Sequence, residues 1–539
     1  MPRLAVAAVL LALATASLWL RAQLSDTRPI PELMPAGALL YLEAKDFQGL
    51  LSDWNNSTVK SRWLKSVNRT VLAESRLVQR LSQAQDEFAK VTGMPLGLSL
   101  ADQTAGRRSG FAFYDLSALR FVYLSQMPES HLDNVQLWRD RTKYTPREVS
   151  GISFYLKTSN DGSRTVAFAS YKDWFFVATD ENLAAETLVL LSGRKAASMA
   201  TDGWFQAATK DAATQGDLRL VYNLTALIAT PQFRTYWLHR NATELKPFSA
   251  GISDLFRQQD GWKEERVMLR QQEVPVASAA AALRSVLAYV PPSAGLYRAW
   301  SMPDRNTLNN ALQSLIAPEQ PQTAVFESPA PEVNAQGGDV GTEADLEIRI
   351  DEPPFQHAAN LSIAPLIDAV TAMQPVAMLQ AQTTRKLGDQ VFVMPSSGLV
   401  IACNHPNRNA LDRALAQVRR PLGPGLVDPL TVSVNGNTIV ITRLNLSQTA
   451  NAIAVPANVQ YLARYNHAAE WPNYKKLFGI LDRTPSGPEG PSTPNGPPFF
   501  SGNIESLGDT LSGLRKASII STDTGAAIHE TVIYEWAQP

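Results

Sequence analysis

The chain has a single cysteine, Cys403, and it lies two residues before His405. Nucleophilic catalysis by a thiol needs a base within reach and a lowered thiol pKa. Position 403 also comes just before an expected helix N-terminus, which favours a thiolate. Thr179 and Glu181 hold the matching places in a related segment, so the shared feature is the start of a helix. We therefore predict a structural Cys403, with a reactive thiol as the alternative.

An alternating acidic segment, Asp345–Glu352, is a second candidate. Its apolar residues Leu346, Ile348 and Ile350 share one face of a strand, and the charged residues share the other. Carboxylates at alternate positions can share a cation such as Ca²⁺. Arg349 lies among them and opposes a cation. We favour a charged outer face that discourages edge aggregation over a metal site.

No other motif indicates a catalytic residue, a cofactor or a metal. The histidines lack the short spacing of a zinc site; they are His131, His239, His357, His405, His467 and His529. The chain has no phosphate-binding glycine loop, no Gly-x-Ser-x-Gly elbow and no dinucleotide fingerprint. An enzyme whose site is assembled from distant residues stays open.

Cationic residues mark an expected amphipathic helix, Val59–Val91. Its apolar positions share one arc at about 100° per residue. The cations lie opposite them, within an arc of roughly 60°; they are Arg62, Lys65, Arg69, Arg76 and Arg80. Near anionic headgroups each cation contributes about 1 kcal/mol. We favour an ordinary solvated helix face, with a membrane surface or an acidic partner as alternatives.

The N-terminus indicates export. Arg3 precedes an uncharged apolar segment, Leu4–Leu20, and Arg21 ends it. A basic start followed by an apolar stretch is the plan of a secretory signal. As a helix the segment is about 25 Å long, within reach of a tilted membrane anchor. We predict a signal peptide or membrane anchor over residues 1–28 and a periplasmic or cell-envelope location, with or without anchoring to the inner membrane.

Composition narrows the class further. The formal net charge of -1 predicts no nucleic-acid partner. One cysteine excludes an intramolecular disulfide framework, and an exported chain without disulfides fits a bacterial envelope. The chain is 45% hydrophobic and has 539 residues, which predicts sizeable cores in two or more domains.

Five pairs of short segments recur in the same order, which predicts an internal duplication. Copy one covers residues 29–272, a linker helix covers 273–288, and copy two covers 289–539. The pairs are Met34–Tyr41 with Val290–Tyr297, Phe176–Asp180 with Val400–Asn404, Val221–Asn223 with Arg464–Asn466, Pro231–Arg234 with Pro472–Lys475, and Phe248–Leu255 with Phe500–Leu507. Asp180 and Asn404 are expected helix N-caps.

Secondary-structure patterns predict an α+β fold. Strand patterns are joined by hairpin turns at Asn160–Gly162, Asn435–Gly436 and Asp523–Gly525. We expect two tandem related domains after an N-terminal apolar helix, each a mostly antiparallel sheet with helices packed on one face. Composition predicts disordered loops over 317–344 and 483–498.

The sequence resembles a family of bacterial exported proteins of unknown function, common in acidobacterial and cyanobacterial genomes. The resemblance is carried by the N-terminal segment, the strand that begins near Pro35-Ala36 and ends beyond Tyr41, a long helix, and a later strand–Asp/Asn–helix unit. It implies an envelope location and supplies no catalytic residues.

We therefore predict a non-enzymatic extracytoplasmic envelope protein. It binds a protein partner or small-molecule ligand in a cleft between the two copies, since such clefts are common ligand sites. The alternative is an exported hydrolase whose site is built from residues distant in sequence. A pocket with convergent carboxylates or a Ser–His contact would favour the hydrolase, and an apolar groove would favour binding.

Overall fold

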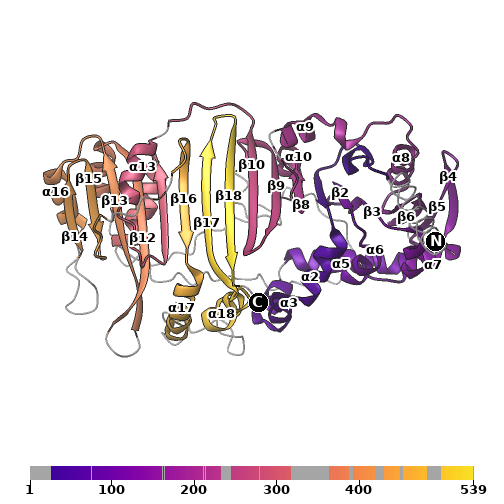
Figure 1. Cartoon of the computed structure of the whole chain (residues 1–539), viewed down its shortest axis with the longest axis horizontal. Helices are drawn as coiled ribbons and strands as arrows, with labels where there is room; N and C mark the ends of the chain where they lie inside the picture. Colours follow the sequence, from indigo (N-terminus) through magenta and orange to yellow (C-terminus); the bar gives the residue numbers. More distant parts are fainter. Residues whose placement is uncertain are drawn as a thin grey trace, which may run out of the picture. The chain divides into compact units, whose positions relative to one another are not determined.

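The chain forms two compact units in the computed structural model (Figure 1). Unit 1 contains the described parts of Met1–Ala277, Asn458–Pro472 and Phe499–Pro539, and unit 2 contains those of Ser278–Ala457 and Asn473–Pro498. The structure describes residues 26–74, 76–160, 162, 164–210, 212, 214–231, 233, 245–277, 279–316, 363–387, 392–418, 430–448, 453, 455–481 and 499–537.

Unit 1 is built on an antiparallel sheet with the strand order β4-β5-β6-β7-β3-β2-β1-β8-β9-β10-β18-β17-β16. The strands are β1 Leu40–Ala44, β2 Ser109–Asp115, β3 Arg120–Gln126, β4 Thr145–Val149, β5 Ile152–Thr158, β6 Thr165–Tyr171, β7 Trp174–Ala178, β8 Leu218–Tyr222, β9 Phe248–Gln258, β10 Gly261–Arg270, β16 Val459–Tyr465, β17 Leu514–Asp523 and β18 Ala527–Trp536. The predicted α+β class with a large antiparallel sheet is confirmed.

Helices cover both faces of this sheet, which corrects the expectation of one covered face. The helices of unit 1 are α2 Phe47–Asn56, α3 Thr58–Lys65, α4 Val67–Ala73, α5 Arg76–Thr92, α6 Leu98–Thr104, α7 Gln136–Arg139, α8 Glu181–Leu191, α9 Gly203–Lys210, α10 Leu224–Ala229 and α18 Glu505–Thr510. Shorter turns are η1 Ile30–Glu32, η2 Glu129–Asn134, η3 Arg141–Lys143, η4 Met199–Thr201 and the π-helix η6 Phe499–Ile504, and α17 His467–Leu481 has residues in both units.

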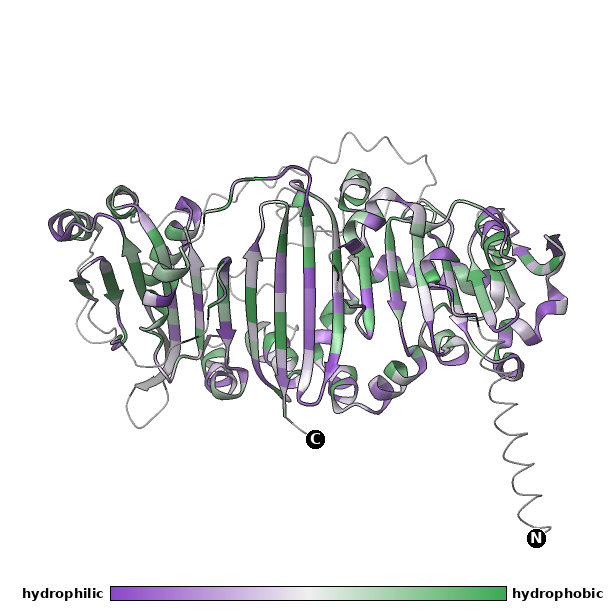
Figure 2. Ribbon diagram, turned by 45° about the horizontal axis from the view of Figure 1, so that its top comes forward, coloured by the Kyte–Doolittle hydropathy of each residue, from purple (hydrophilic) through white to green (hydrophobic). Residues whose placement is uncertain are grey.

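Alternation along the strands explains the two covered faces. Val122 and Phe176 pack with α8 and α9 in one core. Phe121 and Phe175, one residue away, point to the other face and pack with α5 and α6 in a second core. Figure 2 shows apolar residues on strands and on the helices that flank them. Both faces of a strand such as β7 are therefore buried, as its uniform burial shows.

The expected helix Val59–Val91 is three helices, so the prediction of one continuous helix is wrong. Ser57 and Ser66 have extended backbones, with ψ of 143° and 142°, and each ends one helix and caps the next. The Ser57 and Ser66 hydroxyls accept hydrogen bonds from the backbone N–H groups of Lys60 and Arg69. This satisfies backbone donors that a helix start leaves free.

Unit 2 contains a five-stranded antiparallel sheet with the order β11-β12-β13-β15-β14. Its elements are β11 Leu296–Ser301, β12 Pro375–Leu387, β13 Phe392–Cys403, β14 Thr431–Asn435, β15 Thr438–Thr442, α13 Ala280–Leu287, α14 Arg305–Ile316, α15 Ala364–Ala372 and α16 Arg408–Val418. Helices α14, α15 and α16 pack on one face of the sheet. The turn between β14 and β15 is the predicted hairpin, where Gly436 has φ +56°.

The expected linker helix is part of unit 2. Helix α13 contacts β11, β12 and β13 and buries Leu283, Val286 and Leu287. Leu379 and Val400 are fully buried and point away from the α14–α16 face, toward the second face of the sheet. Unit 2 therefore also carries helices on both faces.

The last six strands of the unit 1 sheet have a symmetric order, β8-β9-β10 followed by β18-β17-β16 (Figure 1). The hairpin β9–β10 and the hairpin β17–β18 meet edge to edge through an antiparallel β10–β18 ladder. Residues 458–472 and 499–539 thus belong to unit 1, and the division differs from the expected tandem boundary at residue 289.

The recurring segments give a mixed result. Asn223 and Asn466 each follow a strand and accept a hydrogen bond from a helix N–H. Asp180 caps α8 as predicted, but α16 is capped by Asn407 and not by Asn404. Phe248 begins strand β9, whereas Phe500 lies in the π-helix, so this pair is not structurally equivalent.

Several predicted features lie outside the described residues. They are the apolar segment Leu4–Leu20, the acidic segment Asp345–Glu352, and the loops 317–344 and 483–498. Within the described part of the chain, no helix has the length and apolar character needed to cross a membrane.

Candidate ligand-binding cavity

The connection between β1 and β2 positions the candidate site. These strands pair directly, yet α2 to α6 all lie between them in sequence. Asp46 begins this excursion by capping α2, where its carboxylate accepts from the Gly49 N–H at 3.0 Å. The excursion places α5 and α6 over the sheet face that carries Phe121 and Val177.

A cavity of about 510 Å³ lies between α5, α6 and this sheet face. Its volume is within the usual range of about 300–1,000 Å³ for small-molecule sites. The helices and the loop between them contribute Leu81, Ala84, Phe88, Leu96 and Leu100 to the wall, and the strands contribute Leu42, Phe111, Phe113, Phe121, Tyr123, Val166 and Val177. The wall is therefore mainly apolar and aromatic.

Aromatic side chains form the floor. The ring centroids of Phe111 and Phe121 are 5.1 Å apart, and those of Phe111 and Phe113 are 5.8 Å apart. Phe111 and Phe113 are only half-buried although they lie in the interior of a sheet, because they face the cavity. Leu81 lines the cavity and is 52% exposed, which places it at an open edge.

One end of the cavity is charged. Arg164 precedes β6, and its Nε donates to Glu87 Oε2 on α5 at 2.7 Å. Its Nη1 donates to the Ala118 carbonyl at 2.6 Å. Arg80 Nη1 lies 3.7 Å from Glu87 Oε1, so one carboxylate pairs with two guanidinium groups. Arg164 and Glu87 both line the cavity.

The polar groups at the opposite end are hydroxyls and one carboxylate, and each has a hydrogen-bond partner. The Ser109 and Ser125 hydroxyls are 2.9 Å apart, and the Tyr123 hydroxyl donates to the Thr104 carbonyl at 2.9 Å. The Glu43 carboxylate accepts from the Tyr41 hydroxyl at 2.7 Å. Among the described residues that line the cavity there is no histidine or cysteine.

The five predicted cations do not form one stripe. Lys65 and Arg69 are exposed on α3 and α4, and Arg62 donates from α3 to the Ser512 hydroxyl. Arg80 instead pairs with Glu87, which lines the charged end of the cavity. The side chain of Arg76, the first residue of α5, lies outside the described residues.

Exposed apolar side chains gather on the same helices. The part of the chain that the structure describes exposes nine large apolar side chains, and five of them are Trp54, Leu64, Val71, Leu72 and Leu81. A sixth, Leu507, is on α18, which contacts α3 and α4. We call Leu64, Val71, Leu72, Lys65 and Arg69 the α3–α4 surface.

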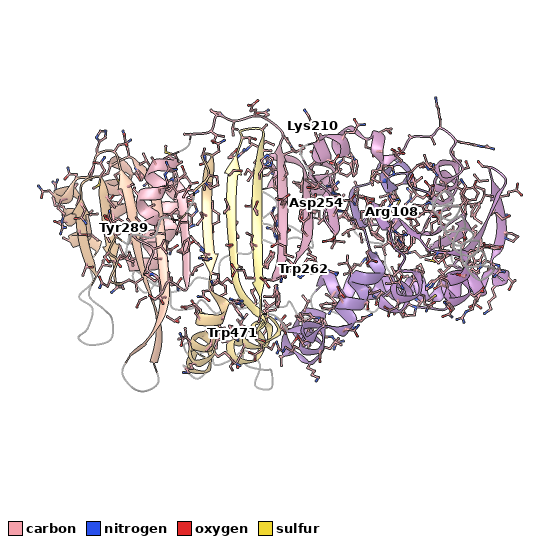
Figure 3. The ribbon with its side chains drawn as sticks, in the orientation of Figure 1. Arg108, Lys210, Asp254, Trp262, Tyr289 and Trp471 are labelled. Atoms are coloured by element: carbon pink, nitrogen blue, oxygen red, sulfur yellow. The ribbon has the colours of Figure 1, made fainter. Side chains whose placement is uncertain are left out.

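Helix α4 is held in place by the C-terminal segment. The Asn68 N–H donates to the Ser506 hydroxyl at 2.9 Å, and the Asn68 side-chain amide donates to Asn503 Oδ1 at 2.6 Å. Nearby, Trp471 Nε1 donates to Asp509 Oδ1 at 3.0 Å (Figure 3). These polar contacts fix α4 without covering Val71 and Leu72, which stay exposed.

Two other titratable residues, Cys403 and Asp254, are buried in positions that indicate a structural role. Cys403 is 1% exposed in the apolar core of unit 2, and burial raises the pKa of its thiol to about 12. This disfavours the reactive-thiol alternative, because the thiolate is the nucleophile. Asp254 on β9 is 3% exposed and bonds both Nε and Nη2 of Arg219 at 2.8 Å, which ties β8 to β9 (Figure 3).

Comparisons with known proteins assign no function. No protein-family model matches the chain, and no curated protein matches it. Solved structures of TP0453 are similar at 13% sequence identity: crystal form I covers 47% of this chain and 82% of that chain with a TM-score of 0.24, and crystal form III covers 46% and 83% with a TM-score of 0.25. Such TM-scores do not establish a shared fold.

Sequence patterns missed the cavity although they identified its strands. Gly110–Tyr114 and Arg120–Leu124 have the composition of strands, but period-2 patterns do not distinguish a filled core from a hollow one. The sequence feature that could have indicated the cavity is the set of aromatic residues expected on one strand face, Phe111, Phe113 and Phe121.

Proposed function

We propose that the chain is a non-enzymatic envelope protein that binds an apolar ligand in the cavity of unit 1. The observation that carries this proposal is a cavity of about 510 Å³ lined mainly by aromatic and aliphatic side chains. Removing a ligand's apolar surface from water contributes about 25 cal/mol per Å². The expected site between the two copies stays a prediction.

The arrangement of polar groups in the cavity supports binding rather than hydrolysis. Hydrolysis needs a nucleophile or water held beside a general base. Ser109 pairs with Ser125, Glu43 accepts from Tyr41, and Glu87 pairs with Arg164. Neither carboxylate is directed at a hydroxyl nucleophile of the cavity wall, so the exported-hydrolase alternative gains no support from this site.

A cavity-filling variant tests the proposal. Ala84 is on α5, is 8% exposed and lines the cavity. Ala84→Phe places a ring in the volume that the ligand needs, and overpacking of this kind costs about 1–3 kcal/mol. We expect binding of the neutral dye N-phenyl-1-naphthylamine, followed by fluorescence, to weaken at least about tenfold, as 1.4 kcal/mol implies.

The matched control is Ser82→Phe, which adds the same ring to the exposed side of α5. It should leave dye binding unchanged, and the thermal unfolding temperature Tm shows whether each variant is folded. Dye binding that survives in a folded Ala84→Phe protein, or no dye binding by the unmodified protein, contradicts the proposal.

We also propose that the α3–α4 surface contacts an anionic membrane. This proposal is supported by exposed apolar and cationic side chains on the same two helices. The apolar ones are Leu64, Val71 and Leu72, and the cations are Lys65 and Arg69. Apolar side chains beside cations are the composition of interfacial helices. With the apolar segment Leu4–Leu20 as a signal or anchor, this contact fits an exported protein at the cell envelope. Sedimentation with liposomes is the measurement that tests it.

We propose, finally, that the chain arose by internal duplication. The sheet of unit 2 has the order β11-β12-β13-β15-β14, and β1-β2-β3-β7-β6 in unit 1 follows the same sequence of positions. The hairpins β9–β10 and β17–β18 supply a second correspondence. Glu265 and Thr531, which occupy equivalent places in these hairpins, are paired at the centre of the β10–β18 ladder.

A further inference from the structure

We propose that the ligand of the unit 1 cavity is an anionic single-chain amphiphile whose headgroup binds at Arg164 and Arg80. This inference rests on the proposed function, because it assigns a headgroup site to the apolar cavity. The proposed ligand has a carboxylate or phosphate headgroup on an unbranched hydrocarbon chain.

The two ends of the cavity differ in charge. Ser109 lies at one end, where it faces Ser125 and where Ala44 pairs with it across β1 and β2. Arg164 lies at the other end, before β6 and near Thr179. A chain lying across the sheet therefore meets bonded hydroxyls and the Glu43 carboxylate at one end, which do not attract an anion, and a guanidinium group at the other.

Among the described residues, two guanidinium groups at the Arg164 end share one carboxylate. Glu87 is the single carboxylate among the described cavity-lining residues at this end, and both Arg164 and Arg80 pair with it. Arg164 uses Nε for Glu87 and Nη1 for the Ala118 carbonyl. Its Nη2 has no hydrogen-bond partner among the described residues, so a guanidinium donor is left for an oxyanion.

Partial burial strengthens this attraction. The Arg164 side chain is 23% exposed, and those of Arg80 and Glu87 are each 31% exposed. A partly buried cation is screened less by salt than an exposed one. The guanidinium fork also matches carboxylate and phosphate oxygens better than an ammonium does. An anion bound here replaces water around the guanidinium groups, while the hydrocarbon chain fills the aromatic part of the cavity.

Arg164 and Glu87 also join β6 to α5, and a purely structural pair must be distinguished from a headgroup site. A structural role predicts equal effects on charged and neutral ligands, since both need the same cavity. A headgroup role predicts effects on the anion alone, and opposite signs for removal of Arg164 and of Glu87. These different signs decide between the two roles.

The experiment compares dodecanoate with dodecanol, which share a hydrocarbon chain and differ in charge. Each displaces N-phenyl-1-naphthylamine from the unmodified protein and from the variants Arg164→Gln, Arg80→Gln and Glu87→Gln. We expect dodecanoate to bind more tightly than dodecanol. Loss of a charged hydrogen bond in Arg164→Gln should weaken dodecanoate about tenfold. Dodecanol should change by less than about twofold, a few tenths of a kcal/mol.

Arg80→Gln should weaken dodecanoate binding to a smaller extent, because Arg164 lines the cavity and Arg80 does not. Glu87→Gln should strengthen dodecanoate binding, because it removes the competing carboxylate. The control Arg147→Gln breaks an exposed ion pair with Glu181 on the other side of the sheet and should change neither affinity. Dodecyl phosphate is tested as a third competitor. Comparing its affinity with that of dodecanoate shows whether the site prefers a phosphate or a carboxylate headgroup.

Equal affinities for dodecanoate and dodecanol overturn the headgroup assignment and leave the apolar-ligand proposal standing. Equal weakening of both by Arg164→Gln, with Glu87→Gln weakening them as well, shows a structural pair and also overturns it. Failure of the unmodified protein to bind the dye and both amphiphiles contradicts the proposed function itself.

Discussion

Two arginines predicted to share one helix face have different surroundings. Arg69 is exposed on α4, whereas Arg80 pairs with Glu87 at the charged end of the cavity. The difference arises because α4 ends at Ala73 and α5 begins at Arg76, so Arg69 and Arg80 lie on separate helices. A guanidinium beside an apolar cavity is a candidate anion site, while one on an open helix face is a weak one.

Cys403 yields a prediction at the residue scale. Burial raises the pKa of its thiol from 9.0 to about 12. At a given pH below 9, a rise of about three units lowers the thiolate population about a thousandfold. We expect iodoacetamide to alkylate the native protein at pH 8 at least about a hundredfold more slowly than the protein unfolded in urea, as measured by mass spectrometry.

The control for Cys403 is a variant with an exposed cysteine, Ser82→Cys/Cys403→Ala, which should react at the rate of an ordinary thiol. Rapid alkylation of Cys403 in the folded protein, with a rate that levels off between pH 7 and pH 8, would show a lowered pKa and restore the reactive-thiol interpretation.

At the scale of elements, α3 and α4 show how serine divides a helical pattern. The apolar periodicity of residues 59–91 fits one helix, but Ser57 and Ser66 accept hydrogen bonds from the N–H groups three residues later. Such caps compete with continuous helix because the hydroxyl replaces a backbone acceptor. The resulting bends expose Leu64, Val71 and Leu72 rather than burying them in one apolar stripe.

The membrane proposal leads to a prediction for α3 and α4. The double variant Lys65→Glu/Arg69→Glu replaces two attractive charges with repulsive ones. We expect sedimentation with vesicles that contain phosphatidylglycerol to weaken at least about tenfold, since each cation contributes about 1 kcal/mol. Binding to phosphatidylcholine vesicles should change little.

The matched control is Arg194→Glu/Lys195→Glu, which makes the same change of charge at exposed residues after α8. Equal loss of vesicle binding in both double variants would indicate a general effect of net charge and would contradict a specific α3–α4 surface.

At the scale of the whole molecule, the C-terminal residues complete a unit begun at the N-terminus. The described residues after Phe499 provide β17 and β18, and β18 pairs with β10 from Gly261 to Leu269. Ala527 and Val532 are each 2% exposed. Unit 1 therefore depends on residues that follow unit 2 in the chain.

Truncation tests this dependence. Removing residues 499–539 deletes β17 and β18 and exposes the backbone edge of β10 to solvent. We expect Tm to fall by at least about 10 °C, because each kcal/mol corresponds to about 2–4 °C in a domain of this size. An unpaired strand edge also promotes association, which light scattering measures.

Removing residues 538–539 alone is the control and should leave Tm unchanged, because both follow the end of β18. A truncated chain that lacks 499–539 but unfolds at the original temperature would show that β10 is a stable edge strand and that unit 1 does not depend on β17 and β18.

The sequence alone determined the fold class and much of the local structure, because strand alternation, turn residues and caps act over a few residues. The hairpin at Asn435–Gly436 and the cap at Asp180 were readable in this way. Only the tertiary structure decided that helices cover both faces of each sheet, that β18 pairs with β10, and that Arg164 and Arg80 share Glu87. These contacts join residues far apart in sequence, and no local pattern encodes which distant partner buries a face or completes a charged pair.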